Sequence, residues 1–213
     1  MCGRYLMDDE VYSDMLIMLS AEIGGANPTL HTSHSRLPRG EVFPTNIAPV
    51  MARGGNKVGE GLANASVLGC KWGFPHWKGA GVIINARAET AVEKKMFRKP
   101  LFERRCVVPS SGFYEWDHAS GKKKKDKYLL RIPGERALFM AGMIDSFKDA
   151  DGSEYSAFVI LTTAANASVA PIHDRMPVIL APEERSLWLG DDAFMEHALH
   201  RTGPPLDPVA CGA

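Results

Sequence analysis

Residues 138–162 read LFMAGMIDSFKDADGSEYSAFVILT, and this stretch contains two apolar runs, at 138–144 and 157–162, separated by polar and turn-forming residues. Short apolar runs bounded by Gly, Pro, Asn or Asp are typical of β-strands. Similar runs recur along the rest of the chain between turn signals. We therefore also predict strands at 46–52, 66–74, 81–86, 105–109, 113–116, 128–132 and 177–180.

Helices are predicted to be few. Apolar residues at helical spacing predict a helix at 8–19, with Asp8 as its N-cap. Two more helices are expected at 89–98 and 183–189, and Pro182 precedes the second, as is common at a helix start. Many short strands with few helices predict an α+β fold, mostly antiparallel, in a single domain spanning residues 1–213.

The composition excludes several classes of protein. The 213 residues include 25 Lys and Arg against 25 Asp and Glu, with 45% hydrophobic and 23% charged residues. These values exclude disordered and fibrous chains. The balanced charge excludes a strongly basic nucleic-acid binder but allows a local basic groove. No segment approaches the roughly 18 apolar residues of a membrane span, and the first ten residues leave no space for a signal-peptide core.

The cysteines and histidines give little sign of a metal site. The four cysteines lie far apart and form no C-x-x-C pair: Cys2, Cys70, Cys106 and Cys211. This spacing favours neither a disulfide scaffold nor a thiolate zinc site, so we expect a reducing, intracellular compartment and no secretion. His197 and His200 have a spacing that could suit a metal, but no third ligand lies nearby. We therefore expect no metal and no cofactor.

Cysteine at position 2 is the first residue with distinctive chemistry. A small second residue permits removal of Met1, which would leave Cys2 with a free α-amine beside its thiol. The reference pKa values of these groups, about 7.7–8.0 and about 8.5, keep both partly nucleophilic near neutral pH. Such an aminothiol can close a thiazolidine ring on an aldehyde, or it can hydrolyse amides with its own amine as base. An incidental small residue at the terminus is the alternative interpretation.

Two short segments carry groups suited to proton transfer. In the segment SSGFYEW at 110–116, Glu115 lies among aromatic residues, and partly apolar surroundings would raise its pKa. In the segment IHDRMP at 172–177, His173 is the residue that titrates near neutral pH. A solvent-facing strand residue and a polar loop are the ordinary alternatives.

A third segment, IINARAET at 83–90, passes from an apolar strand into a polar cluster and then a helix. Asn85 and Arg87 would share one face there if the strand continues. Polar residues gathered at a strand end indicate a site more often than packing. The segment WGFPHW at 72–77 is an aromatic-rich loop whose side chains could stack on bases, although burial in a core is commoner.

Taken together, these residues resemble the SOS-response-associated peptidase (SRAP) family, whose members crosslink to abasic sites in DNA. The resemblance covers residues 1 to about 180. It rests on six short segments in the family's order: MCGRY at 1–5, TNIAP at 45–49, WGF at 72–74, NARAET at 85–90, GFYEW at 112–116 and IHDRMP at 172–177. Each segment alone is weak evidence for the family, but six segments in the same order are specific for it.

The resemblance implies a covalent chemistry and a fold. Loss of Met1 would expose Cys2, which would form a thiazolidine with the ring-opened aldehyde of an abasic site in single-stranded DNA. By the same match, Asn85 would position the Cys2 amine and Glu115 would transfer protons during imine formation. His173 would assist opening of the sugar ring and reversal of the link. The family fold is a single α+β domain around a β-rich, barrel-like core with a few flanking helices.

The resemblance also implies a set of DNA contacts. Arginines would meet phosphates or the polar edge of the site, and three other side chains would line the DNA channel. The expected contacts are Arg4, Arg87 and Arg175 in the first group, and Asn46, Trp72 and Thr162 in the second. Lys95 stands where an arginine is expected, which would keep the charge and lose the bidentate geometry. We expect a monomer whose partner is abasic single-stranded DNA, located in the cytoplasm, nucleoid or nucleus.

Two other functions remain open on the sequence. One is a thiol peptidase or amidase that uses Cys2, Glu115 and His173, with self-removal of Met1 as its minimal activity. The other is a non-catalytic module that binds modified or single-stranded DNA.

Overall fold

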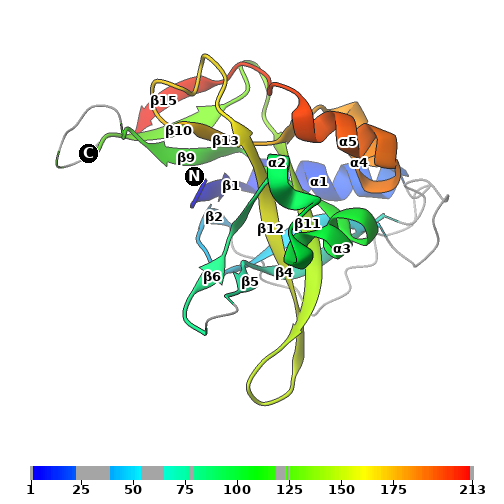
Figure 1. Cartoon of the computed structure of the whole chain (residues 1–213). Helices are drawn as coiled ribbons and strands as arrows, with labels where there is room; N and C mark the ends of the chain where they lie inside the picture. Colours follow the sequence, from blue (N-terminus) through cyan, green and yellow to red (C-terminus); the bar gives the residue numbers. More distant parts are fainter. Residues whose placement is uncertain are drawn as a thin grey trace.

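The computed structural model describes residues 2–22, 39–53, 65–76, 79–118, 123 and 125–211, with only the backbone described at 16–22 and 65. Strands dominate these residues and helices are few, so the predicted α+β class is confirmed (Figure 1). Most strands predicted from apolar runs are present with small shifts at their ends, but those predicted at 66–74, 81–86 and 177–180 are each divided into two strands. Among the described residues, no helix is long and apolar enough to span a membrane.

The centre of the fold is a closed ring of five strands. The ring consists of β3 (Ile47–Arg53), β4 (Ala65–Trp72), β8 (Arg105–Ser110), β11 (Leu138–Lys148) and β12 (Glu154–Ala164). Pairing runs from β12 through β4, β3, β8 and β11 and returns to β12, and only the β12–β4 pair is parallel. Closure satisfies the backbone groups that an open sheet would leave at its edges. The barrel-like core implied by the family resemblance is thus confirmed.

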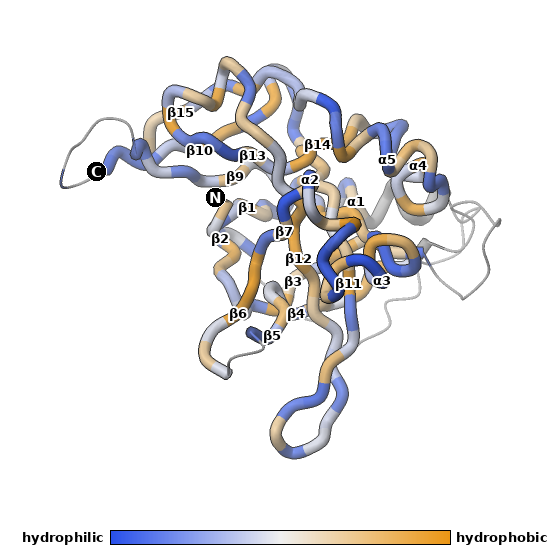
Figure 2. The backbone as a smooth tube through the Cα atoms, in the orientation of Figure 1, coloured by the Kyte–Doolittle hydropathy of each residue, from blue (hydrophilic) through white to orange (hydrophobic). Residues whose placement is uncertain are grey.

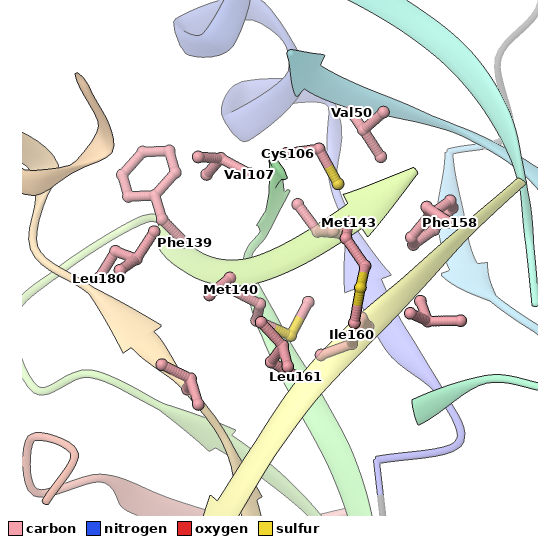
Figure 3. Packing of buried hydrophobic residues seen from close by; sticks show 14 of the residues in the cluster. Val50, Cys106, Val107, Phe139, Met140, Met143, Phe158, Ile160, Leu161 and Leu180 are labelled. Carbon is pink, nitrogen blue, oxygen red and sulfur yellow. The ribbon is translucent and has the colours of Figure 1, made fainter. Parts of the chain in front are cut away.

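Apolar side chains fill this barrel. Val50, Cys106, Met143 and Phe158 come from four different strands and converge in one buried cluster (Figure 3). Gly142 is required where β11 and β12 approach closely, because an added Cβ would lie 2.9 Å from the Val159 carbonyl oxygen. Figure 2 shows that the apolar residues follow the barrel strands, whereas the turn at the end of the long β11–β12 hairpin is largely hydrophilic. The barrel interior is therefore a packed core.

Three short strands extend the barrel. β13 (Arg175–Pro177) pairs with β12, and β14 (Ile179–Leu180) pairs with β11. β7 (Asn85–Arg87) lies parallel to β12 just beyond the end of β4. These pairings place the polar segments at 85–90 and 172–177 beside the same strand, although they are far apart in sequence.

A second sheet lies beside the barrel and has the order β15-β10-β9-β1-β2. Its strands are β1 (Tyr5–Met7), β2 (Gly40–Val42), β9 (Gly112–Trp116), β10 (Lys127–Arg131) and β15 (Asp207–Cys211). The sequence did not predict β1, β2 or β15. Three to five residues without clear alternation carry too little signal. These strands form because β9 pairs with β1, β1 in turn pairs with β2, and β10 pairs with β15.

The helices cover parts of the barrel (Figure 1). They are α1 (Asp9–Glu22), α2 (Ala88–Ala91), α3 (Lys95–Glu103), α4 (Arg185–Gly190) and α5 (Asp192–His200), with a 3₁₀ turn at Pro182–Glu184. Asp8 caps α1 as predicted, because its Oδ1 accepts a hydrogen bond from the Val11 N–H at 2.9 Å.

For two of the divided elements the local structure shows the cause of the division. The expected helix at 89–98 is two helices, α2 and α3. Ala91 and Phe97 are both buried, and Phe97 is six positions after Ala91. In one continuous helix six positions correspond to a rotation of about 240°, so the two side chains would point in different directions. A break between the helices lets both face the protein. The expected strand at 66–74 is interrupted at Gly73, whose φ is 115°. β5 (Phe74–Pro75) then pairs with β6 (Val82–Ile83) in a separate small sheet.

Candidate functional site

The pairing of β1 with β9 determines where Cys2 lies. Tyr5 is opposite Phe113, and the Tyr114 N–H donates to the Arg4 carbonyl oxygen at 2.8 Å. Because the two strands are antiparallel, the residues before Tyr5 run alongside the residues after Phe113. Cys2 is consequently drawn into the protein, where it is fully buried. Met1 lies outside the described residues.

Asn85 holds the backbone of Cys2 from the opposite side. Its Nδ2 donates a hydrogen bond to the Cys2 carbonyl oxygen at 2.9 Å. Asn85 begins β7 and is aligned with Ile160 of β12, so the barrel itself positions this amide. The Asn85 Oδ1 is buried and has no hydrogen-bond partner among the described residues, so it can accept one from an N–H group beside Cys2.

Glu115 and Cys2 both have side chains whose pKa is raised by burial. Burial raises the pKa of the Glu115 carboxyl, whose residue is only 2% exposed. Burial, together with the negative charge of Glu115, raises the pKa of the Cys2 thiol well above its usual range. The neutral thiol is therefore the resting form near neutral pH, and a proton on Glu115 is easier to keep than on an exposed glutamate.

His173 lies in the loop before β13. Its Nδ1 accepts a hydrogen bond from the Arg175 backbone N–H at 3.0 Å, and the same Nδ1 is 2.9 Å from Asp174 Oδ1. Burial lowers the pKa of His173. This burial therefore favours the neutral ring of His173 over the protonated ring. The charge of Asp174 contributes to the raised pKa of Glu115, which associates this loop with the Cys2 site.

Arg4 is enclosed by aromatic rings and an acid. Its guanidinium carbon lies 4.2 Å from the centre of the Phe43 ring and 5.0 Å from that of Trp116. Its Nη1 donates to Glu41 Oε2 at 2.9 Å. The opposite oxygen of Glu41 accepts a hydrogen bond from Lys127 at 2.6 Å. These contacts, chiefly the bond from Lys127, lower the pKa of Glu41.

The other two predicted arginines differ in exposure. Arg87 is exposed at the end of β7. Arg175 is largely enclosed, and its guanidinium binds both carboxylate oxygens of Glu89 and the Thr162 carbonyl oxygen. The pKa of Glu89 is lowered mainly by this hydrogen bond. Arg87 is thus open to a phosphate, whereas Arg175 is occupied within the protein.

The three side chains predicted to line the DNA channel are buried or are hydrogen-bonded within the protein. Trp72 is fully buried, its ring stacks on Phe158, and its Nε1 donates to the Ile84 carbonyl oxygen at 3.1 Å. Thr162 is also fully buried. Asn46 is partly exposed, and its Oδ1 accepts the Phe43 N–H at 3.0 Å across a turn. Direct contact of DNA with the first two would require a rearrangement of the core, and contact by any of the three stays a prediction.

Lys95 lies on a different part of the surface. It begins α3, is exposed, and borders a shallow hollow with Arg98, Lys99 and Phe102. Figure 1 shows α3 apart from β1 and β9. The structure therefore groups Cys2, Asn85, Glu115 and the His173 loop and leaves Lys95 at a distance from them.

The sequence analysis did not identify several residues that contact the predicted site residues. Arg4 is paired with Glu41, which also binds Lys127, and Arg175 is paired with Glu89. The ring of His118 packs edge-on against His173, with ring centres 5.2 Å apart. None of these residues belongs to the quoted segments except Glu89. Local sequence offers no signal for the others, because each reaches the site by strand pairing or loop packing.

Comparisons with known proteins identify the family of this chain. The family model "SOS response associated peptidase (SRAP)" matches residues 1–208. The Bacillus subtilis protein named abasic site processing protein YoqW is 31% identical over 202 residues, covering 89% of this chain and 80% of that protein. The Escherichia coli protein named abasic site processing protein YedK is 33% identical over 194 residues, covering 89% and 79%.

Solved structures share the fold. A Bacteroides thetaiotaomicron protein superposes with a TM-score of 0.73 at 25% identity, covering 98% of this chain and 91% of that one. A Bordetella bronchiseptica protein superposes with a TM-score of 0.75 over the whole of both chains, and at 21% identity it supports the fold alone.

Proposed function

The chain belongs to the SOS-response-associated peptidase (SRAP) family, and from this we propose that it processes abasic sites in DNA by covalent capture through Cys2. The relatives that are named abasic site processing proteins support the substrate. The observation that carries the chemistry is a buried Cys2 whose carbonyl is held by Asn85 and whose thiol interacts with the Glu115 carboxyl. We treat residues 1–213 as one intracellular, monomeric domain.

The reaction begins when Met1 is removed and the Cys2 amine is freed. This amine attacks the C1′ aldehyde of the ring-opened sugar and forms a carbinolamine, which loses one water to give an imine. The Cys2 sulfur then adds to the imine carbon, and its proton passes to the nitrogen. The product is a thiazolidine, and the overall change is the loss of one water.

The neighbouring groups have separate tasks in this scheme. Glu115, with its raised pKa, donates the proton that lets water leave the carbinolamine. Asn85 keeps the Cys2 backbone in place and offers its Oδ1 to the freed amine. His173, whose lowered pKa favours the neutral ring, assists opening of the sugar ring and, in reverse, release of the link.

Single-stranded DNA is the expected form of the substrate. An aldehyde inside a stacked duplex is screened, and reaching it costs a few kcal/mol of unstacking. The formal net charge of this chain is zero, so it lacks a long-range field that would help to open a duplex. We assign phosphate and polar contacts first to the residues that are exposed or partly exposed near the site: Arg4, Asn46 and Arg87. The buried Trp72 and Thr162, the enclosed Arg175 and the distant Lys95 would contact DNA only after a rearrangement or through a longer strand.

The direct test is incubation with a single-stranded oligonucleotide that carries one abasic site, followed by a denaturing gel and intact mass measurement. The adduct should have the mass of the chain without Met1 plus the oligonucleotide, less one water. An oligonucleotide whose aldehyde has been reduced to an alcohol is the matched control and should give no adduct. A wild-type chain that lacks Met1 and still forms no adduct would contradict the proposal.

Removal of Met1 by the chain's own thiol chemistry is the remaining enzymatic part of the proposal. Cell-free synthesis without a methionine aminopeptidase separates self-removal from processing by another enzyme. A product that keeps Met1 under these conditions would assign the removal to another enzyme and leave the DNA chemistry intact.

A further inference from the structure

One carboxylate on the second sheet is shared between two cations. Glu41 on β2 accepts from Arg4 Nη1 through Oε2 at 2.9 Å and from Lys127 Nζ through Oε1 at 2.6 Å. Leu6 of β1 is opposite Glu41, and Lys127 of β10 is opposite Trp116 of β9. The three charged side chains therefore reach across β1 and β9 to meet.

Aromatic rings line the same place. Arg4 lies over the rings of Phe43 and Trp116, and Lys127 Nζ is 3.9 Å from the centre of the Tyr114 ring. Phe43 is 40% exposed, so part of this aromatic lining faces solvent. Cations alternating with aromatic rings are the composition of grooves that bind single-stranded nucleic acid.

We propose that Arg4 and Lys127 form a phosphate-binding subsite for the DNA strand beside the abasic nucleotide, and that the Glu41 carboxylate occupies this subsite in the free protein. The inference rests on the proposed function. A carboxylate that gives one oxygen to each of two cations has the anionic O–C–O edge that matches the O–P–O edge of a phosphodiester. A phosphate can therefore replace it on the same two donors.

The surroundings permit this exchange. The Glu41 side chain is 33% exposed, so the displaced carboxylate can turn into water. The rings around Arg4 and Lys127 keep both cations in place when the carboxylate leaves. Arg4 is two residues from Cys2, and its carbonyl oxygen lies 3.8 Å from the Cys2 Sγ. A phosphate on Arg4 is thus held close to the reacting end of the chain.

The consequence is that Glu41 weakens DNA binding. It competes for the two cations and also repels the incoming phosphate. Replacing it by Gln removes the charge while keeping the shape, so both cations become available. The proposed phosphate needs both cations, so removing Lys127 should remove most of this gain.

The experiment measures non-covalent binding of an undamaged, labelled single strand by fluorescence anisotropy at several salt concentrations. Glu41→Gln should bind about three- to tenfold more tightly than wild type at low salt. Lys127→Met should bind more weakly, with the salt slope reduced by about 0.7, the value of one phosphate contact on a single strand. In the double variant, Lys127→Met should cancel most of the gain from Glu41→Gln.

Glu154→Gln is the matched control, because Glu154 is 72% exposed and pairs with Lys148 on the β11–β12 hairpin. It changes the net charge equally and should alter binding much less than Glu41→Gln. Equal binding by these two variants would overturn the subsite. If Glu41→Gln fails to fold, Lys127→Met compared with Lys148→Met carries the test, and equal binding again overturns it.

Crosslinking of an abasic strand is measured in parallel and separates the two proposals. Wild-type crosslinking without the Glu41 and Lys127 effects would refute the subsite and leave the covalent function standing. The Glu41 and Lys127 effects without any crosslink would support the subsite and refute the covalent function.

Discussion

The barrel interior and the N-terminal side of the second sheet are both buried, but they are built differently. Inside the barrel, apolar side chains from five strands fill the space (Figure 3). Around Cys2, the described residues include buried polar atoms without hydrogen-bond partners: Arg4 Nε, the Tyr5 hydroxyl and Asn85 Oδ1. Each such atom costs about 1–3 kcal/mol. The barrel is thus arranged for stability, whereas the N-terminal site gives up stability to keep reactive and binding groups dry.

This contrast predicts that variants of the two regions differ in their effects on stability and on the reaction. Substitutions at the site should change the chemistry and leave stability unchanged or improved. Substitutions in the barrel should lower stability without a specific effect on the reaction.

The largest effect is expected at Cys2. Cys2→Ala should abolish the heat-stable link completely, because the thiazolidine needs the sulfur, while non-covalent DNA binding stays near wild type. Cys2→Ser can form the imine only, so its link should survive a denaturing gel only after reduction. Full crosslinking by Cys2→Ala on such a gel would eliminate Cys2 as the nucleophile.

Glu115→Gln should slow crosslinking by roughly 10²–10⁴-fold, since the amide keeps the shape and cannot donate and regain a proton. It should also stabilise the protein at high pH. Burial raises the folded-state pKa of Glu115, so wild-type stability is fully present at low pH and is lost as pH rises through that pKa.

Thermal unfolding of wild type and Glu115→Gln at pH 4 and pH 8 tests this sign. The gain of the variant over wild type should be larger at pH 8, by about 2–4 °C for each 1 kcal/mol in a chain of this size. A gain confined to pH 4 would show that the buried carboxyl is not destabilised by ionisation.

The barrel should respond in the opposite way. Phe158→Ala removes a large buried side chain that stacks on Trp72, and it should lower the free energy of unfolding by about 3–5 kcal/mol. The crosslinking rate of the folded variant should stay close to that of wild type. Val209→Ala is the control, since Val209 is 52% exposed and should change stability by less than about 0.5 kcal/mol in a denaturant titration.

The smallest effect is expected at His173, and it depends on the substrate. His173→Ala should slow capture of a natural, ring-closed abasic site by about 10²-fold, because ring opening loses its proton carrier. A substrate that presents a free aldehyde should be affected much less. Rapid-quench rates on the two substrates give the ratio, and equal slowing on both would assign His173 a structural or phosphate-facing role.

The strands of the barrel could be predicted from the sequence because each is a run of apolar residues between turn residues. The strands that build the site could not. Tyr5–Met7 and Gly40–Val42 are three residues each, and their formation depends on partners far along the chain. The same limit applies to Trp72, which the resemblance assigned to a DNA channel and which the structure stacks on Phe158.

The sequence by itself determined the family and, through that resemblance, predicted which residues carry the chemistry. Cys2, Asn85, Glu115 and His173 are identified by residue type and by the short segments that surround them. It could not determine their environment, because burial, pKa and hydrogen-bond partners depend on chain segments that meet only after folding. The tertiary structure decided that Cys2 is buried, with its carbonyl oxygen held by Asn85, and that Glu41 lies between Arg4 and Lys127. The physical reason is that β1, β2, β9 and β10 pair across sequence separations that no local pattern records.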